Sequence, residues 1–366
     1  MKRRIAILFG GRSAEHGVSC VSARAVIDAL DRDRYEPIPI GITIEGRWQL
    51  MSEPPALGPA ATELPSVSDT SGTAVELAGE GDDAAIVTED GRRTGLDIVL
   101  PLLHGPYGED GTVQGMLELA GIPYVGSGVL ASAVGMDKAV QKVLFTSGGL
   151  PVVAHEVVHE REWEEDPEGV EARATDLGYP LFAKPATLGS SVGITKVLQS
   201  EELRAAVEEA LRYARKAVLE RSMEGSREIE CGVLGNDDPV ASLPGEIVPS
   251  GEFYDYRSKY LDDGTRLIVP AELALELVEE IQRMAVAAFQ AIDGAGMARV
   301  DFFLREPREI VVNEINTIPG FTPVSMYPKL WEASGVAYPE LIDRLVELAV
   351  ERHERDRKKG GASSAG

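Results

Sequence analysis

The sequence predicts an α/β fold whose N-terminal part is an open sheet with helices packed against it. Three observations lead to this prediction. The apolar run 5–9 is followed by the glycine pair 10–11 and by a helical pattern over about 19–30, which is the order strand, turn, helix. Further apolar strands are expected at about 35–42 and 96–103. In such a sheet the carboxyl ends of the strands border a crevice that can hold a ligand.

Strand and helix patterns continue along the rest of the chain to about residue 352. The segment 52–94 is rich in Pro, Gly, Ser, Thr and acids, and we expect a surface loop with short strands there. The polar tail 353–366 is expected to be disordered. The other expected elements are helices at about 112–120, 138–146, 201–215, 272–292 and 338–352, strands at about 152–158, 181–184, 217–220, 228–234 and 241–248, and a hairpin within 299–316.

The composition limits the classes of partner. The 366 residues include 36 basic and 60 acidic ones, a formal net charge of −24, which argues against nucleic acid as a partner. A local group of lysines could still hold an anionic nucleotide. Cys20 and Cys231 each lie in an apolar run and are expected to be buried, reduced thiols. The apolar run near the N-terminus is shorter than a signal-peptide core and no membrane-spanning stretch follows, so we expect a cytoplasmic protein without membrane contact.

The segment RVDFFLREPREIVVNEIN, residues 299–316, carries the strongest functional signal. It predicts two strands joined by a short turn, and side chains along a strand alternate between its two faces. Arg299 and Asp301 would share one face, as would Glu314 and Asn316. If the faces coincide, a guanidinium, two carboxylates and an amide oxygen meet on one patch, and such oxygens suit Mg²⁺ together with substrate phosphates. The alternative is a solvated edge hairpin with an ordinary salt bridge.

Two glycine-containing segments are candidates for chemistry. The segment 10–16, GGRSAEH, lacks the G-x-G-x-x-G dinucleotide fingerprint. It is either a simple turn or a helix entry at which Glu15 meets a cationic group of a substrate. In the segment 184–193, KPATLGSSVG, Lys184 ends an apolar strand and precedes a loop whose N–H groups and hydroxyls can wrap phosphates. Because the lysine precedes the glycines, this is not the P-loop motif, and the loop gains significance only together with the acidic hairpin.

A run of aromatic and basic residues, FYDYRSKY at 253–260, is expected to be a surface loop. It is bracketed by Gly251 and by the turn residues 262–264. Its tyrosines either pack locally or form a lid that excludes water from a site.

The segment His155-Glu156-Val157-Val158-His159 matches the H-E-x-x-H pattern of zinc proteases. That chemistry needs both histidines on one helical turn, whereas the flanking β-branched residues predict a strand. On a strand the two histidines would lie roughly 13 Å apart and could not share a zinc ion. We therefore expect exposed strand histidines and no zinc site.

Seven segments of the chain carry a resemblance to a known family: GGRSAEH, LHGPYGEDGTVQG, VGSGVLASAVGMDK, KPATLGSSVG, FYDYRSKY, RVDFF and NEINTIPG. In this order they resemble the D-alanine–D-alanine ligases of the ATP-grasp superfamily, from about residue 4 to 350. The resemblance implies an N-terminal α/β domain over 1–126 that precedes the ATP-grasp fold, a central ATP-grasp subdomain over 127–216 and a C-terminal one over 217–352, with ATP between the last two. It also implies two Mg²⁺ ions, with Mn²⁺ as a substitute, a homodimer and a role in peptidoglycan precursor synthesis.

The resemblance further implies roles for individual residues on the nucleotide side. Lys138 and Lys184 would contact the ATP phosphates, and Asp301, Glu314 and Asn316 would bind Mg²⁺, with Glu314 bridging both ions. The remaining residues implied for ATP are Glu220 and the backbone near Met223 at adenine, Glu228 at ribose, and Ser191 and Lys259.

On the amino-acid side, Glu15 would hold the ammonium of the first D-alanine, with His104 nearby. Glu15, Ser190 and Tyr260 would form a hydrogen-bonded link that closes the loop over the site. Arg299 and the Gly320 amide would stabilise an oxyanion, and the second substrate or the phosphates would lie near Lys259, Ser325 and the amide of Met326.

The implied reaction is the attack of one D-alanine carboxylate on the γ-phosphate of ATP, which gives ADP and an acyl phosphate that the amine of a second D-alanine then attacks. Two alternatives stay open within the superfamily: another carboxylate–amine ligase, and a D-alanine–D-lactate ligase. A nucleotide-binding regulator without catalysis is a third, and the intact set of acidic and basic residues at the hairpin argues against it.

Overall fold

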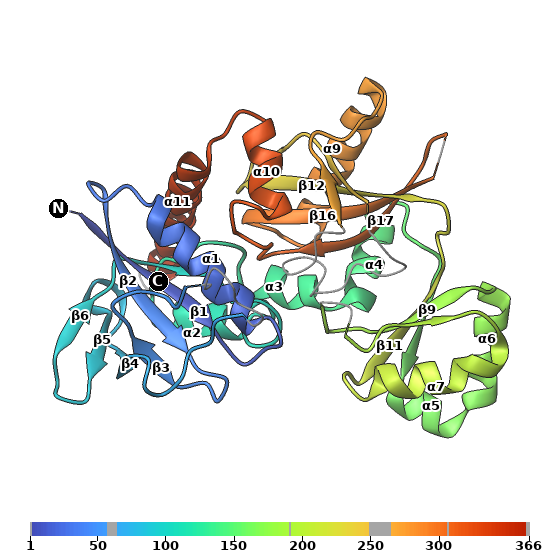
Figure 1. Ribbon diagram of the computed structural model, residues 1–366, viewed down its shortest axis with the longest axis horizontal. Helices are drawn as coiled ribbons and strands as arrows, with labels where there is room; N and C mark the ends of the chain where they lie inside the picture. Colours follow the sequence, from blue (N-terminus) through green and yellow to red (C-terminus); the bar gives the residue numbers. More distant parts are fainter. Residues whose placement is uncertain (1, 57–63, 190–191, 249–264, 306, 364–366) are drawn as a thin grey trace.

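Figure 1 shows the computed structural model, which describes residues 2–56, 64–189, 192–248, 265–305 and 307–363. The strands in these ranges form a seven-stranded sheet in the N-terminal part, a four-stranded sheet in the middle and a six-stranded sheet in the C-terminal part. Helices pack against each of them, so the predicted α/β fold class is confirmed.

The N-terminal sheet is built around the predicted apolar strands. Its order is β6-β5-β4-β3-β2-β1-β7, and β1 pairs in parallel with β2 on one side and β7 on the other. This is a switch point of the kind at which α/β sheets open a crevice beyond the carboxyl ends of their strands. The segment 52–94 contributes the predicted short strands. The elements are β1 (Arg3–Gly10), α1 (His16–Ala29), β2 (Tyr35–Ile42), β3 (Trp48–Leu50), β4 (Thr73–Ala78), the 3₁₀ helix η1 (Gly81–Asp83), β5 (Ala85–Thr88), β6 (Arg93–Gly95), β7 (Ile98–Pro101) and α2 (Thr112–Leu119).

The middle sheet has the order β10-β9-β11-β8 and is antiparallel throughout. Three helices cover it through a common apolar core that includes Trp163, Val170, Leu203 and Leu219. The sequence analysis anticipated the strands β8, β9 and β11 but missed α5, α6 and β10. The elements are β8 (His155–His159), α5 (Glu160–Glu165), α6 (Pro167–Leu177), β9 (Leu181–Pro185), β10 (Thr195–Val197), α7 (Ser200–Leu211) and β11 (Lys216–Arg221).

The C-terminal sheet has the order β15-β14-β12-β16-β17, with β13 paired to β12. Helix α9 packs on it together with α3 and α4, whose Ala131 and Phe145 join the same core. Helices α10 and α11 instead share a core with β1 and α1 of the N-terminal part. The elements are α3 (Val129–Met136), α4 (Lys138–Ser147), β12 (Arg227–Gly235), β13 (Val240–Ala241), β14 (Gly245–Val248), β15 (Arg266–Ile268), α9 (Leu275–Ala291), β16 (Gly296–Arg305), β17 (Glu309–Asn316), α10 (Met326–Ala333) and α11 (Tyr338–Ser363).

The prediction of a disordered tail from residue 353 is wrong for most of that segment, because α11 continues to Ser363. Arg352 explains the continuation: it donates to the carbonyl oxygens of Gly126 and Tyr124 and places its guanidinium 4.4 Å from the centre of the Tyr124 ring. One turn later Arg355 pairs with Asp237 and Glu351. The charges that suggested disorder therefore fix the helix to neighbouring segments, which composition alone does not reveal.

Candidate active site

The predicted hairpin forms and brings its polar side chains together. β16 and β17 pair so that Arg299 lies opposite Asn316 and Asp301 lies opposite Glu314. Arg299 donates from Nε and Nη2 to the two oxygens of Asp301, at 2.6 Å each, and Asn316 Nδ2 donates to Asp301 Oδ2 at 3.1 Å. The side chains of Arg299 and Asp301 are 13% and 15% exposed, so the alternative of a solvated edge hairpin is excluded.

A β-bulge in β17 sets the direction of these side chains. The register shifts in the middle of the hairpin, which leaves Asn313 without an opposing residue on β16. Val312 and Ile315 are both buried although they lie three residues apart, whereas Asn313, Glu314 and Asn316 are partly exposed. In a regular strand, residues three apart point to opposite faces. The extra residue therefore keeps Glu314 and Asn316 on the site face while Val312 returns to the core.

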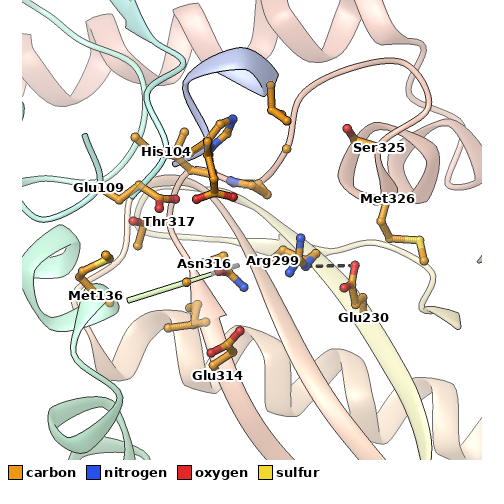
Figure 2. A pocket seen from close by; sticks show the side chains of 18 of the residues that line it. His104, Glu109, Met136, Glu230, Arg299, Glu314, Asn316, Thr317, Ser325 and Met326 are labelled. Carbon is orange, nitrogen blue, oxygen red and sulfur yellow. Dashed lines mark hydrogen bonds and ion pairs between the residues drawn. The ribbon is translucent and has the colours of Figure 1, made fainter. Parts of the chain in front are cut away.

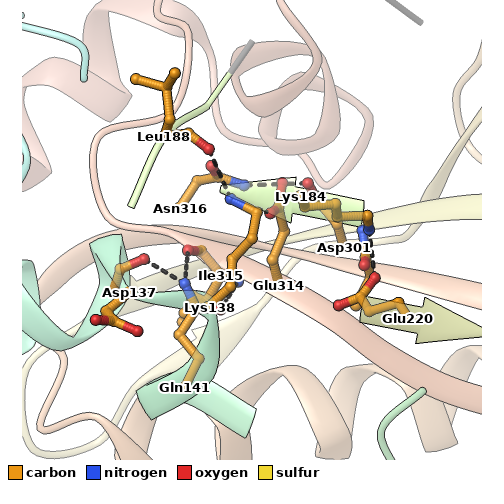
Figure 3. Close-up of polar contacts among 12 residues, drawn as sticks. Asp137, Lys138, Gln141, Lys184, Leu188, Glu220, Asp301, Glu314, Ile315 and Asn316 are labelled. Carbon is orange, nitrogen blue, oxygen red and sulfur yellow. Dashed lines mark hydrogen bonds and ion pairs between the residues drawn. The ribbon is translucent and has the colours of Figure 1, made fainter. Parts of the chain in front are cut away.

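Helix α4 brings Lys138 to the hairpin. Asp137 caps this helix by accepting two backbone N–H bonds from the first turn, at 3.0 and 3.1 Å. Lys138 Nζ lies 3.1 Å from Glu314 Oε2 and donates to the carbonyl oxygen of Leu188 at 3.0 Å (Figure 3). Burial alone would raise the pKa of Glu314, but Lys138 and the other nearby cations outweigh it and lower the pKa to about 2. Glu314 is therefore ionised at neutral pH, as a metal ligand must be.

A buried carboxylate holds the second predicted phosphate-binding lysine. Lys184, on β9, pairs with Glu220 of the neighbouring strand β11 (Figure 3). Glu220 Oε1 also lies 2.7 Å from Nζ of Lys142, a residue of α4 that the sequence analysis did not single out. Burial opposes the charge of Glu220, but the two lysines outweigh it and hold its pKa well below the usual range. The adenine role of Glu220 stays a prediction, and its carboxylate already has these two partners.

The substrate side of the site gathers residues from three loops and from the start of α10. Figure 2 shows His104, Glu109 and Thr317 on one side of Arg299, and Ser325 and Met326 on another. His104 is buried, with Nδ1 3.0 Å from the carbonyl oxygen of Ile318. The predicted substrate residues that line this cavity are Glu15, His104, Arg299, Gly320, Ser325 and Met326.

Glu109 is a titratable residue of this cavity that the sequence analysis missed. Its Oε2 accepts a hydrogen bond from the Gly105 N–H at 2.7 Å. Burial and the neighbouring charge of Glu15 raise the pKa of Glu109 to about 8. A carboxyl group shifted in this way, beside a second carboxylate, is typical of functional sites. Its only sequence signal was an acidic pair inside a glycine-rich loop, which does not say which side chain points inward.

The cavity that contains Glu15 meets a second cavity at the hairpin. The second one is lined by Lys184, Glu220, Met223, Glu228 and Asp301 among others. Four charged residues line both cavities: Lys138, Glu230, Arg299 and Glu314. Arg299 Nε also lies 3.0 Å from Glu230 Oε2 (Figure 2). A group bound in either cavity can therefore reach the same cations and carboxylates.

The structure brings together every predicted site residue that it describes, since each lines one or both of these cavities. The other four predicted residues lie outside the described ranges, so the link between Glu15, Ser190 and Tyr260 stays a prediction. These four are Ser190, Ser191, Lys259 and Tyr260.

The H-E-x-x-H segment forms the strand β8, as predicted, and not a helix. Its histidines face different partners along β11, with His155 opposite Glu220 and His159 opposite Lys216. Within the described residues, no group of three or more His, Cys, Asp or Glu side chains is arranged to hold a metal ion. The hairpin set differs in kind, because two carboxylates and an amide leave room for the phosphate oxygens that Mg²⁺ takes as further ligands.

Comparison with known proteins gives the family. The family model described as "D-ala D-ala ligase N-terminus" matches residues 4–127, and "D-ala D-ala ligase C-terminus" matches residues 144–347. The chain belongs to the D-alanine–D-alanine ligase family. The D-alanine–D-alanine ligase of Streptomyces griseus is 51% identical over 96% of this chain and 93% of its own length, and that of Geobacillus thermodenitrificans is 50% identical over 97% of each. The predicted resemblance is confirmed.

Solved structures extend the ligase comparison to the fold. The D-alanine-D-alanine ligase of Coxiella burnetii superposes with a TM-score of 0.88 at 39% identity, over 100% of this chain and 98% of that one. The VanG D-Ala:D-Ser ligase of Enterococcus faecalis gives 0.82 at 35% identity, over 95% and 100%. The ATP-grasp fold is thereby confirmed, and this family uses ATP and a divalent metal. None of the described helices is long and apolar enough to span a membrane.

Proposed function

We propose that this protein is an ATP-dependent ligase that joins two molecules of D-alanine into D-alanyl-D-alanine through a D-alanyl phosphate. The observation that carries the proposal is the wall shared by the two cavities, where Lys138, Arg299 and Glu314 are accessible from both. A carboxylate in one cavity and the terminal phosphate of a nucleotide in the other would meet at these residues. Family membership supplies the class of substrate.

The first D-alanine binds with its ammonium at Glu15 and its carboxylate towards the shared wall. That carboxylate attacks the γ-phosphorus of ATP, the bond to the β-phosphate oxygen breaks, and ADP leaves. Lys138 and Lys184 offset the charge on the transferring phosphoryl oxygens, and alignment of the reacting groups does most of the rest.

The second D-alanine attacks the acyl carbon with its free amine. The negative charge that develops on the carbonyl oxygen is stabilised by Arg299 and by the N–H of Gly320. Collapse of the tetrahedral intermediate forms the amide bond and releases phosphate, while the loop link of Glu15, Ser190 and Tyr260 excludes water from the acyl phosphate.

Asp301, Glu314 and Asn316 are proposed to hold two Mg²⁺ ions, with Glu314 bridging them and Mn²⁺ as a substitute. The fit rests on the donor set, because all three side chains offer hard oxygen ligands on one face and Glu314 is held ionised. When bound, the ions would neutralise charge on the nucleotide phosphates.

The remaining assignments follow the family resemblance. Adenine is proposed to contact Glu220 and the backbone near Met223, and ribose to contact Glu228. The further contacts proposed are Ser191 and Lys259 with ATP, His104 with the first D-alanine, and Lys259, Ser325 and Met326 with the second substrate.

We also propose the division into an α/β domain over 1–126, a central subdomain over 127–216 and a C-terminal subdomain over 217–352. A homodimer, a cytoplasmic location and a role in peptidoglycan precursor synthesis belong to the same proposal.

The test is ADP release by the purified chain with ATP, Mg²⁺ and D-alanine, with the product identified by mass. We expect ADP and D-alanyl-D-alanine in equal amounts, and no release with L-alanine, which is the matched control. Parallel reactions with D-serine or D-lactate beside D-alanine test the alternative second substrates. ADP release that does not depend on D-alanine, or a product that is mainly an ester or a mixed dipeptide, would overturn the proposal.

A further inference from the structure

Lys142 is a buried lysine that the proposed reaction does not use. It lies on α4 one turn after Lys138, and its side chain is 1% exposed. Its ammonium lies 2.7 Å from Glu220 Oε1 and donates to the carbonyl oxygen of Asn313 at 3.1 Å. Burying an ammonium is unfavourable unless partners compensate for the lost water. The two partners therefore indicate what this residue does.

Each partner of Lys142 belongs to a different half of the nucleotide site. Glu220 is the carboxylate that holds Lys184, a proposed phosphate contact. Asn313 is the extra residue of the bulge in β17 and directly precedes Glu314, a proposed metal ligand. One ammonium on α4 thus joins two strands, β11 and β17, that belong to different sheets.

We propose that Lys142 is a positioning residue that fixes the phosphate-binding half and the metal-binding half of the nucleotide site relative to each other. This inference rests on the proposed function, because it concerns the same ATP site. Lys142 compensates the charge of Glu220, so that the positive charge of Lys184 remains available to attract phosphate. It also holds the carbonyl group of the bulge, so that Glu314 points to the metal position.

The charge part of the proposal follows from the balance of the cluster. Glu220 with Lys142 and Lys184 carries one net positive charge. Without Lys142, Glu220 and Lys184 form a neutral pair, and the attraction for phosphate falls by one unit charge in a poorly solvated site.

The bulge part follows from hydrogen bonding. Removing the lysine takes this donor from the partly buried Asn313 carbonyl oxygen, and a partly buried acceptor that loses its hydrogen bond costs free energy. A shift of the bulge would relieve that cost, and Glu314 is the next residue of the strand.

Lys142→Met tests both parts, because Met fills a similar volume and removes the charge and the donor. We expect the Kd for ADP, measured by calorimetry without metal, to rise at least tenfold. We also expect the Mg²⁺ concentration that half-saturates the ADP complex to rise at least threefold.

The double variant Lys142→Met, Glu220→Gln separates the two parts. With Glu220 neutral, Lys184 again carries one net charge. Pyrophosphate lacks the adenine that Glu220 is proposed to contact, so its Kd without metal should rise in the single variant and return to within threefold of the wild type in the double variant. The requirement for Mg²⁺ should stay raised at least threefold, because the carbonyl of Asn313 still lacks its donor. If the single variant fails to fold, this double variant, which also removes the buried carboxylate of Glu220, carries the test alone.

Phe145→Leu is the matched control for mere destabilisation. Phe145 lies on the same helix, is fully buried in the apolar core and touches neither cavity. It should lower the melting temperature and leave both binding measurements unchanged. A folded Lys142→Met protein with wild-type ADP affinity and Mg²⁺ requirement, or a double variant with a wild-type Mg²⁺ requirement, would overturn the role of Lys142. Failure of the wild type to bind ADP would instead contradict the proposed function.

Discussion

Glu109→Gln should change how the stability of this protein depends on pH. The pKa of Glu109 is raised from 4.5 to about 8 by burial and by Glu15, so the folded protein keeps a proton that the unfolded chain loses near pH 4.5. Between these two values stability falls as pH rises, because the unfolded state releases the proton and the folded state does not. Below about pH 4.5 the carboxyl is neutral in both states and does not change the free energy of unfolding. Above about pH 8 it is ionised in both states, and the full cost of burying its charge lowers the stability of the fold.

The size of the effect follows from the shift. A shift from 4.5 to about 8, at roughly 1.4 kcal/mol per pKa unit, corresponds to about 5 kcal/mol. This is an upper limit, because Glu109 is partly exposed to the cavity and water there moderates the penalty. The glutamine side chain has no charge to bury and can still accept the N–H of Gly105. Part of this change already occurs below pH 5.5, so we expect the variant to gain between about 1 and 3 kcal/mol over the wild type as pH rises from 5.5 to 8.5.

The assay is urea unfolding of wild type and variant at half-unit steps from pH 5.5 to 9. The difference between the two free energies of unfolding isolates Glu109, because the other titrating groups are common to both proteins. Glu332→Gln, which removes an exposed carboxylate on α10, is the matched control and should give a flat difference. A flat difference for Glu109→Gln would refute the reasoning, since it would mean that this carboxyl titrates alike in both states.

Three further predictions concern the reaction. Glu314→Gln should reduce ADP release at saturating Mg²⁺ by at least 100-fold, about 2.7 kcal/mol, because it removes the charge proposed to bridge two ions. The circular dichroism spectrum should not change. Activity within a few-fold of wild type would exclude that bridge. The double variant His155→Ala, His159→Ala should keep ligase activity within about twofold of the wild type. Metal analysis of the purified wild type should find no stoichiometric zinc. One zinc per chain, lost in the double variant, would contradict the strand geometry. Tyr260→Phe removes one hydrogen bond, worth roughly 0.5–1.5 kcal/mol. The variant should retain dipeptide synthesis but gain D-alanyl–D-lactate formation, most clearly at lower pH where the D-alanine amine is protonated. An unchanged product ratio at every pH would exclude this role of Tyr260.

The hairpin was predictable because its signal is local. Alternation along a strand puts Arg299 beside Asp301 and Glu314 beside Asn316, and the observed register places the two pairs opposite each other. A second local signal, the β-branched residues in and around the H-E-x-x-H segment, identified β8 as a strand despite its histidine spacing. The bulge was not predictable, because the pattern VVNEIN does not say which residue is the extra one.

Residues whose role depends on distant segments escaped the sequence analysis. In the sequence, Lys142 is a second lysine in the helix predicted over about 138–146. Its partners on β11 and β17 are met only when α4 packs in the folded protein. Glu109 depends in the same way on the loop that brings it beside Glu15. The tail beyond residue 352 is a third case, because Arg352 is stabilised by Tyr124 and Gly126, more than 200 residues away in the chain. Composition and periodicity describe neighbours in sequence, and these contacts are made only in the folded protein.

The cations of the site are already paired within the protein, which explains how a chain of net charge −24 can take an anionic nucleotide. Lys138 pairs with Glu314, Lys184 with Glu220, and Arg299 with Asp301 and Glu230. If Glu314 and Asp301 hold a divalent ion, as proposed, Lys138 and Arg299 would lose these carboxylate partners and would be available for phosphate and for the oxyanion. Bound metal and nucleotide would then compensate each other's charge, and neither would have to be buried alone. Lys142 and Glu220 would take no part in this exchange, because neither pairs with Glu314 or Asp301 and both side chains are shielded from solvent. On this proposal they would keep their positions while the other ion pairs change partners.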